Sequence, residues 1–251
     1  ILILYIYIYK MNDVINNIIN DSMDIAIDGS NNTTDIISSS TNSKIFNNNN
    51  NNNNNDIINA LNLEKYVYIL SGTIDDYPWG YSRNPETQLH CKNRMFICNT
   101  MKNLGLEPLF NDSFCTEYII NIESAIKNWE NSNYKDENKF SQVERESKEI
   151  IIWNYAGVIR GTKFPDKYVM YSAHYDTADE YGPTQGSCDP LSCVAVGLEI
   201  ARLFVNNPPE TSVIIVFFDG EERGLLGANE FVNNLKTSST INIKNILLVL
   251  D

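Results

Sequence analysis

The sequence of 251 residues is poor in histidine and in basic residues. It contains two histidines, and its 19 Lys and Arg against 32 Asp and Glu give a formal net charge of −13. Such a chain lacks the basic face that binds a nucleic-acid phosphate backbone, so we expect no nucleic-acid partner. The sequence also lacks a glycine-rich nucleotide-binding loop and a Gly-x-Ser-x-Gly nucleophile elbow, so neither of those chemistries is indicated.

The first ten residues do not form a recognisable membrane segment. Residues 1–9 are apolar, but a membrane helix needs about 20 such residues. The segment also lacks the basic start and the small-residue cleavage site of a signal peptide. Because Met11 is the first methionine, we expect residues 1–10 to precede the true start or to be the remnant of a longer leader. We expect no membrane span, and the localisation stays open.

Paired cysteines are also missing, and apolar residues are scarce in one long segment. The five cysteines are an odd number without tight paired spacing, so they define neither a metal site nor a redox compartment. Residues 11–56 are rich in Asn, Ser, Asp and Thr, and residues 47–55 are all asparagine. Such a tract buries too little apolar surface to offset the cost of ordering it. We therefore expect a disordered leader over 1–56 and one folded domain over 57–251.

Apolar runs that alternate with helical patterns predict an α/β fold. Strands are expected near 107–110, 117–121, 149–160, 167–173, 212–218 and 245–250, and helices near 56–68, 87–104, 190–206 and 225–235. The strict alternation in the second half predicts a mostly parallel mixed sheet with helices on both faces.

Two adjacent glutamates, Glu221 and Glu222, follow the apolar run 213–218. A short, continuous run of β-branched and aromatic residues is typical of a strand covered on both faces, and Gly220 ends it. Open α/β sheets bind ligands at the carboxyl ends of their strands. Like charges there repel each other unless a cation or a proton separates them. Taken alone, such a pair is more often part of a solvated surface.

Three further segments favour a metal site. His174 ends the run 167–173, and Asp176 points to the same side because the side-chain period of a strand is two. Asp176 can then accept from one imidazole nitrogen while the other nitrogen faces a metal. Asp189 precedes a helical pattern, where it could also be an ordinary N-cap. Asp251 follows another apolar run, and this convergence at strand ends is hard to explain as surface decoration.

Four motifs together carry a family resemblance. They are Ser-Ala-His-Tyr-Asp at 172–176, Gly-Ser-Cys-Asp-Pro-Leu-Ser at 186–192, Phe-Phe-Asp-Gly-Glu-Glu at 217–222 with Gly-Leu-Leu-Gly at 224–227, and Leu-Val-Leu-Asp at 248–251. In order and spacing they resemble the co-catalytic zinc aminopeptidases, which include bacterial leucyl aminopeptidase and glutamate carboxypeptidase II. The resemblance implies a zinc-exopeptidase fold of the phosphorylase/hydrolase-like type. Residues 154–161 and 165–167 also resemble the hairpin before the histidine strand in this family.

The resemblance implies a role for each matched residue. Four would be metal ligands: His174, Asp189, Glu222 and Asp251. His174 and Asp251 would bind one zinc ion, Glu222 the second, and Asp189 would bridge the two. Asp176 would orient His174, and Glu221 would be the general base toward a metal-activated water.

The sequence also departs from the family pattern. The family's second zinc site uses a histidine downstream of the final aspartate, but the only other histidine here is His90, which we do not expect to substitute. We expect two zinc ions per intact catalytic domain, a second site that lacks its histidine in this chain, and a domain incomplete at its C-terminal end. Cys188 could offer a soft thiolate ligand, although small-residue packing is the favoured explanation for Cys188 and Cys193.

The expected activity is that of a zinc-dependent, aminopeptidase-type exopeptidase acting on a peptide or protein with a free N-terminus. One alternative is an enzyme like the glutaminyl-peptide cyclotransferases, which share the scaffold but use one zinc ion. Another is an inactive fragment or a peptidase-like binding module. Proteins of this family are often secreted or held in lytic compartments, but the resemblance does not fix the localisation of this chain. The oligomeric state also stays open.

Overall fold

The computed structural model describes residues 58–72, 83, 87–110, 112–130, 146–178, 184–238 and 241–250. The predicted leader over 1–56 and the predicted ligand Asp251 lie outside the described residues. The chain divides into two units, Ile1–Ala60 and Leu61–Asp251, and the fold that follows is that of the second unit.

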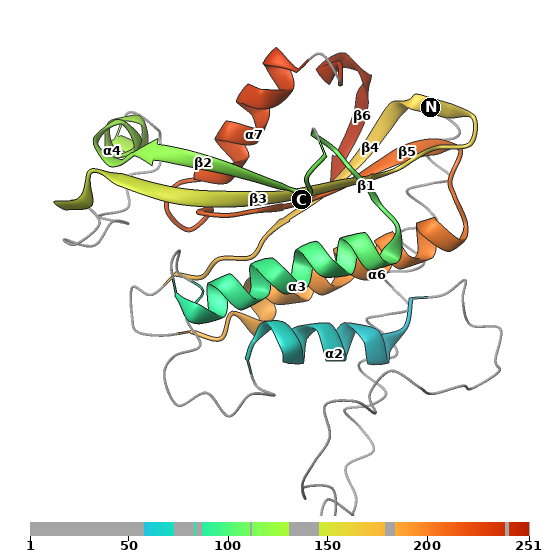
Figure 1. Ribbon diagram of the computed structural model, residues 1–251, viewed down its shortest axis with the longest axis horizontal. Helices are drawn as coiled ribbons and strands as arrows, with labels where there is room; N and C mark the ends of the chain where they lie inside the picture. Colours follow the sequence, from blue (N-terminus) through green and yellow to red (C-terminus); the bar gives the residue numbers. More distant parts are fainter. Residues whose placement is uncertain are drawn as a thin grey trace, which may run out of the picture. The chain divides into compact units, whose positions relative to one another are not determined.

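A six-stranded mixed sheet forms the centre of this unit (Figure 1). Its strands are β1 (Glu107–Pro108), β2 (Cys115–Asn121), β3 (Glu149–Ile159), β4 (Phe164–His174), β5 (Thr211–Phe218) and β6 (Ile246–Leu250). They lie in the order β1-β3-β5-β4-β6, and β2 also pairs with β3. All six coincide with or overlap the predicted strands.

Helices cover both faces of the sheet, as the sequence predicts. They are α2 (Ala60–Leu70), α3 (Gln88–Leu104), α4 (Ile122–Glu130), α6 (Ser192–Asn206) and α7 (Leu226–Thr237). Figure 1 shows α3 and α6 on one face and α7 on the other. The short segments η2 (Ser187–Leu191) and η3 (Ile243–Asn245) precede α6 and β6. Among the described helices, none is long and apolar enough to cross a membrane.

The strand pairing confirms a mixed sheet and corrects two expectations. Parallel pairing joins β4 to β5 and β6, whereas β3 is antiparallel to β1, β2 and β5. The parallel part is therefore smaller than expected. The hairpin expected from residues 154–161 and 165–167 is wrong, because β5 lies between β3 and β4. Residues 160–163 reverse the chain direction, so β5 is parallel to β4 and antiparallel to β3.

The central strand β5 explains how the two helical layers are held. Its residues alternate between the faces, and Ile214, Val216 and Phe218 pack in a cluster with Phe231 of α7. Phe217 faces α6, where a Cβ on Gly197 would lie 2.9 Å from its ring. Only glycine allows the helix to approach so closely. This packing sets the N-terminus of α6 against the carboxyl ends of β4 and β5.

Helix α3 has clear signals at both ends. The Thr87 side chain accepts from the backbone N–H of His90 at 3.2 Å, which is an N-cap. Gly105 follows the helix with φ of 91°, a left-handed conformation that glycine adopts without strain. The helix predicted over 87–104 is thus confirmed, and it fixes where His90 lies.

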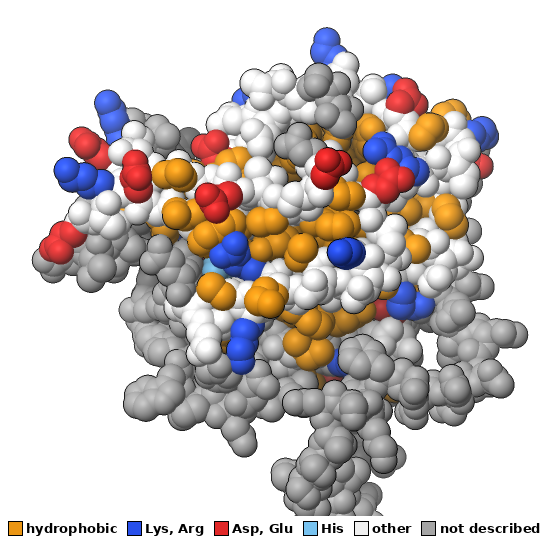
Figure 2. Space-filling view, viewed as in Figure 1, with side chains coloured by type: hydrophobic (Ala, Val, Ile, Leu, Met, Phe, Trp, Pro, Cys, Tyr) orange, Lys and Arg blue, Asp and Glu red, His pale blue; other side chains and the backbone are white. Residues whose placement is uncertain are grey.

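The surface is not uniformly polar. Figure 2 shows a band of hydrophobic side chains across the middle of one face, where Figure 1 places α3 beside the sheet. Large exposed apolar side chains on these elements include Met95 of α3 and Ile119 of β2. Most acidic side chains on this face lie on the sheet side of the band.

Candidate metal centre

The carboxyl ends of β4 and β5 bring the predicted site residues together. The two strands are parallel and in register, with His174 opposite Phe218. The segments that leave them, 175–178 and 219–222, therefore start at the same edge of the sheet. η2, which precedes α6, brings Asp189 to this edge as well.

His174 lies at the centre of the cluster. Its Nε2 is 3.0 Å from Oδ1 of Asp189 and 3.8 Å from Oε2 of Glu221. The His174 side chain is 16% exposed and the Asp189 side chain 80% exposed, so the aspartate reaches the buried ring from solvent. Nε2 is thus the ring nitrogen that faces Asp189 and Glu221.

A candidate metal-ligand set follows from this geometry. His174, Glu221 and Glu222 each offer one ligand atom, and the three atoms lie within 4.8 Å of one another. Asp189 touches His174 but is outside this set, and Asp251 lies beyond the described residues. One imidazole nitrogen with carboxylate oxygens is a donor set that zinc accepts. The residues present therefore fit a zinc ion.

Asp176 connects His174 to the segment that carries the two glutamates. Its carboxylate is buried, and its Oδ1 lies 3.4 Å from Nδ1 of His174. That contact is longer than a well-aligned hydrogen bond, and Nδ1 makes none with the described residues. Oδ1 also accepts the backbone N–H of Glu221 at 3.1 Å, and Oδ2 accepts that of Glu222 at 3.2 Å. One carboxylate thus contacts both halves of the site.

The clustered charges shift the pKa values in a consistent pattern. Burial lowers the pKa of His174, but Asp176, Glu221 and Asp189 outweigh burial and raise it to about 9. Burial likewise raises the pKa of Asp176, yet His174, Arg223 and the backbone N–H of Glu221 lower it overall. For Glu222, burial and the neighbouring carboxylates raise the pKa. The cluster therefore favours positive charge at His174, either a proton or a metal ion.

The turn that carries the two glutamates depends on Gly220. Its φ is 66°, and a Cβ there would lie 3.2 Å from Cβ of Leu226. Its N–H donates to Oδ1 of Asp219 at 3.0 Å. Three successive backbone N–H groups, those of residues 220–222, therefore donate to the carboxylates of Asp219 and Asp176. From the sequence, Gly220 was expected only to end the strand.

Two buried arginines were not predicted from the sequence. Arg83 is fully buried and donates from Nε to the carbonyl of Tyr175 at 2.9 Å and from Nη1 to that of Gln185 at 2.6 Å. It thereby links the segment after His174 to the loop before η2. Arg223 is 8% exposed and lowers the pKa of Asp176. Neither stands in a sequence pattern that would reveal these contacts.

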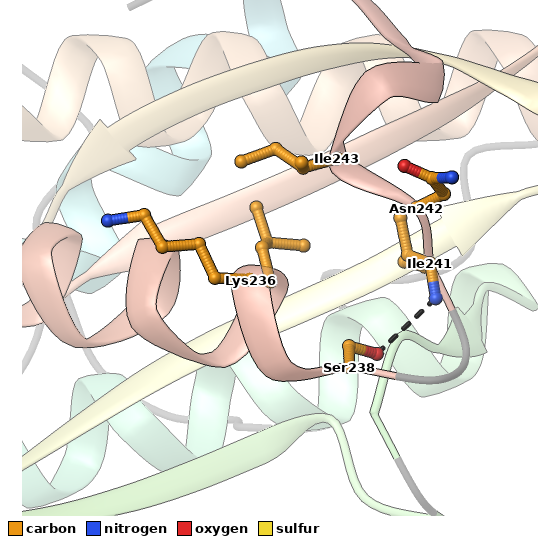
Figure 3. Close-up of a pocket in the computed structure, with 6 residues that line it drawn as sticks. Lys236, Ser238, Ile241, Asn242 and Ile243 are labelled. Carbon is orange, nitrogen blue, oxygen red and sulfur yellow. Dashed lines mark hydrogen bonds between the residues drawn. The ribbon is translucent and has the colours of Figure 1, made fainter.

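A separate groove lies at the end of α7. It has a volume of about 340 Å³ and is lined by Leu235, Lys236, Ser238, Ile241, Asn242 and Ile243. Figure 3 shows its wall, where the backbone N–H of Ile241 donates to Oγ of Ser238 at 3.3 Å. Its lining includes a cation and no carboxylate or imidazole, so it offers no metal site comparable to the cluster around His174.

A mixed α/β sheet with an imidazole and several carboxylates at one strand edge defines a candidate metal-dependent enzyme. Residues 154–251 match Peptidase family M28. A "Probable zinc metalloprotease" of Pyrenophora tritici-repentis is 34% identical over 113 residues, which cover 41% of this chain and 26% of that protein. A "Glutamate carboxypeptidase 2 homolog" of Caenorhabditis briggsae is 38% identical over 96 residues, 36% of this chain and 12% of that protein. The resemblance to zinc exopeptidases is therefore confirmed for this part of the chain.

Solved structures support the fold. A leucine aminopeptidase precursor from Bacteroides thetaiotaomicron has a TM-score of 0.52 and 18% identity, covering 76% of this chain and 61% of that chain. A glutaminyl cyclase from Bacteroides thetaiotaomicron has a TM-score of 0.51 and 18% identity, covering 76% of this chain and 60% of that one. At this identity the likeness concerns the fold alone. The chain spans about a quarter of the length of the fungal relatives that it matches.

Proposed function

We propose that this protein is a zinc-dependent exopeptidase that removes residues from the amino end of peptides. The observation that carries the proposal is the convergence of His174, Glu221 and Glu222, whose ligand atoms lie within 4.8 Å of one another. The match of residues 154–251 to Peptidase family M28 supports it independently. The relatives described as zinc metalloprotease and glutamate carboxypeptidase support zinc and peptide-bond hydrolysis in the same way.

Zinc would be held by His174, Glu222, Asp189 and Asp251, with two ions per intact catalytic domain. His174 offers Nε2, and Asp189 already lies 3.0 Å from that nitrogen. When bound, zinc supplies a Lewis acid that lowers the pKa of water and polarises a carbonyl oxygen. Asp176 would keep Nε2 directed at the site, because its carboxylate lies beside Nδ1 on the other side of the ring.

Glu221 is the proposed general base. Its side chain is 34% exposed, so it can reach a water molecule and a substrate, while its backbone N–H is held by Asp176. The carboxylate would take a proton from the attacking water as the new C–O bond forms. It would then give that proton to the departing amine as the peptide C–N bond breaks. A positioned carboxylate of this kind contributes roughly a hundred- to ten-thousand-fold to the rate.

A second candidate is glutaminyl-peptide cyclisation. The candidate ligands within the described residues suffice for one metal ion. A glutaminyl-peptide cyclotransferase would require one zinc ion. Glutaminyl cyclases are also among the structures with the same fold. In that reaction the substrate's own α-amine would attack its side-chain amide, and Glu221 would carry the proton from the amine to the departing ammonia.

Two assays on one preparation separate these functions. We expect the intact, zinc-loaded catalytic domain to hydrolyse aminoacyl p-nitroanilides, and N-acetylated substrates to be resistant because they lack the free amine. The peptidase proposal also expects two zinc ions per intact domain by elemental analysis. Cyclisation of a peptide with N-terminal glutamine, with one zinc ion and no amide hydrolysis, would replace the peptidase proposal with the cyclase. Absence of both activities in the intact, zinc-loaded catalytic domain would contradict both.

A further inference from the structure

A second His–Asp pair lies buried behind the metal centre. His90 on α3 and Asp219 at the end of β5 are both 0% exposed, although they stand 129 residues apart. Nε2 of His90 lies 3.1 Å from Oδ1 and 3.1 Å from Oδ2 of Asp219. The imidazole thus faces the whole carboxylate rather than one oxygen.

Every polar atom of Asp219 is engaged. Its N–H donates to Oδ1 of Asn154 at 3.1 Å, and its carbonyl accepts the N–H of Gly227 at 3.0 Å. Its Oδ1 accepts from the N–H of Gly220 at 3.0 Å, and its Oδ2 accepts from the N–H of Trp153 at 2.9 Å. Asp219 therefore connects β3, the start of α7 and the turn that carries the glutamates.

His90 supplies what this carboxylate otherwise lacks. A buried carboxylate destabilises the fold unless hydrogen-bond donors surround it. His90 adds a side-chain donor to the backbone N–H groups that already contact Asp219. Both oxygens of this carboxylate accept backbone N–H groups, so Nε2 of His90 is placed as a further donor. The ring is held by Tyr175, whose ring centroid is 5.2 Å away in a stacked arrangement. Nδ1 has no hydrogen-bond partner among the described residues, so Asp219 is the ring's main polar contact.

We propose that His90 is a positioning residue for Glu221 and Glu222, acting through Asp219 and the turn at Gly220. Two carboxylates hold this turn. Asp219 accepts the N–H of residue 220, and Asp176 accepts those of Glu221 and Glu222. The catalytic meaning of this role rests on the proposed function. Small displacements of ligands and base matter at such a site, since about 0.5 Å separates productive from unproductive geometry.

A matched pair of variants tests this coupling. His90→Gln retains an N–H donor on a flexible chain, whereas His90→Met has comparable size and no donor. In the 251-residue chain without added metal, we expect amide hydrogen exchange at residues 220–222 and at Trp153 to be about tenfold faster in His90→Met, the effect of losing about one charge-assisted hydrogen bond. His90→Gln should exchange like the wild type. Exchange is normalised to amides in the middle of β5, which removes any effect of global stability.

Asn93→Ala is the control on the same helix. Asn93 is also buried, but its Nδ2 donates to the carbonyl of Leu70 at 2.8 Å, away from the metal centre. Its loss should leave exchange at residues 220–222 unchanged. If His90→Met does not fold, His90→Leu replaces it, because leucine also lacks a donor and leaves Asp219 unchanged. Faster normalised exchange at these amides in that variant is again the expected result.

Zinc affinity, measured by competition with a chromophoric chelator, gives the second readout. We expect it to be about tenfold weaker in His90→Met and near wild type in His90→Gln and Asn93→Ala. Unchanged normalised exchange in His90→Met, or equal exchange in the Met and Gln variants, would overturn the proposal. If the wild-type chain does not bind zinc, the proposed function fails, and hydrogen exchange alone still decides the role of His90.

Discussion

Nδ1 of His174 lies 3.4 Å from Oδ1 of Asp176, and the same carboxylate accepts the backbone N–H groups of Glu221 and Glu222. One buried aspartate therefore sets the imidazole and the glutamate pair relative to each other. His174 lies at the end of β4 and Asp176 in the segment after it, whereas the two glutamates follow β5. Metal affinity and base position should consequently respond together when Asp176 is changed.

Asp176→Asn should weaken zinc binding by about ten- to a hundredfold, the effect typical of a residue that orients a metal ligand. The amide keeps the size of the carboxylate but turns one acceptor into a donor, which faces either His174 or a backbone N–H. Chelator competition measures the affinity. Asp166→Asn, at an exposed position of β4, is the control and should bind zinc like the wild type. Equal affinities for the two variants would contradict the role of Asp176.

Zinc binding at pH 7 should release about one proton from His174. The pKa of His174 is raised to about 9, so Nε2 carries a proton at pH 7 that the metal must replace. Calorimetry in two buffers of different ionisation enthalpy counts this proton. For the same reason, zinc affinity should rise with pH up to about 9. Heats that do not depend on the buffer would contradict a protonated His174 at pH 7.

The raised pKa of His174 also affects the stability of the chain without metal. The sign follows from the direction of the shift: the folded state holds the proton more tightly than the unfolded state. This contribution to stability should be complete below pH 6.5 and should be lost as the pH rises toward about 9. Urea unfolding at a series of pH values measures it, and His174→Gln should remove this part of the pH dependence.

Gly220→Ala should destabilise the fold by about 1–2 kcal/mol, because φ is 66° and L-residues with a side chain disfavour this region. It should also weaken zinc binding, since the turn carries Glu221 and Glu222. Gly105→Ala is the matched control, with φ of 91° at the end of α3. It should lower the free energy of unfolding by a similar amount and leave zinc affinity unchanged. A loss of zinc affinity in both variants would mean that general destabilisation explains the effect.

Arg83→Lys should lower the free energy of unfolding by about 1.5–3 kcal/mol, because a lysine cannot reproduce two separate guanidinium hydrogen bonds. These bonds connect the carbonyls of Tyr175 and Gln185. Arg160→Lys, at an exposed ion pair with Glu107, should change stability by at most about 0.5 kcal/mol. Chemical denaturation of both variants gives the comparison, and equal effects would contradict the structural role of Arg83.

Local patterns predicted much of the fold. The continuous apolar runs of β4 and β5 and the capped helix α3 are visible in the sequence because strand burial and helix caps act over a few residues. His174, Glu221 and Glu222 could be predicted for the same reason, since each follows such a run. The place of β5 between β3 and β4 could not, because strand order depends on packing between distant segments. For the same reason, residues 154–161 resemble part of a hairpin that the described part of the sheet does not contain.

The contacts behind the site were the least predictable. Arg83, His90 and Asp219 act through hydrogen bonds to residues about 90 to 130 positions away. A single arginine or histidine in a polar or helical segment carries no periodic signal. The sequence pattern of α3 predicts only that one face of the helix is buried. Asp219 stood inside a recognised motif, yet its role depends on His90 and Trp153, which the motif does not include.

The most direct test of the metal centre is the zinc affinity of the chain compared with that of His174→Gln, combined with X-ray absorption at the zinc edge. We expect the wild type to bind zinc tightly through one imidazole nitrogen and carboxylate oxygens, and His174→Gln to bind it at least about a hundredfold more weakly while keeping its fold. Equal affinities, or a spectrum without an imidazole ligand, would contradict this expectation.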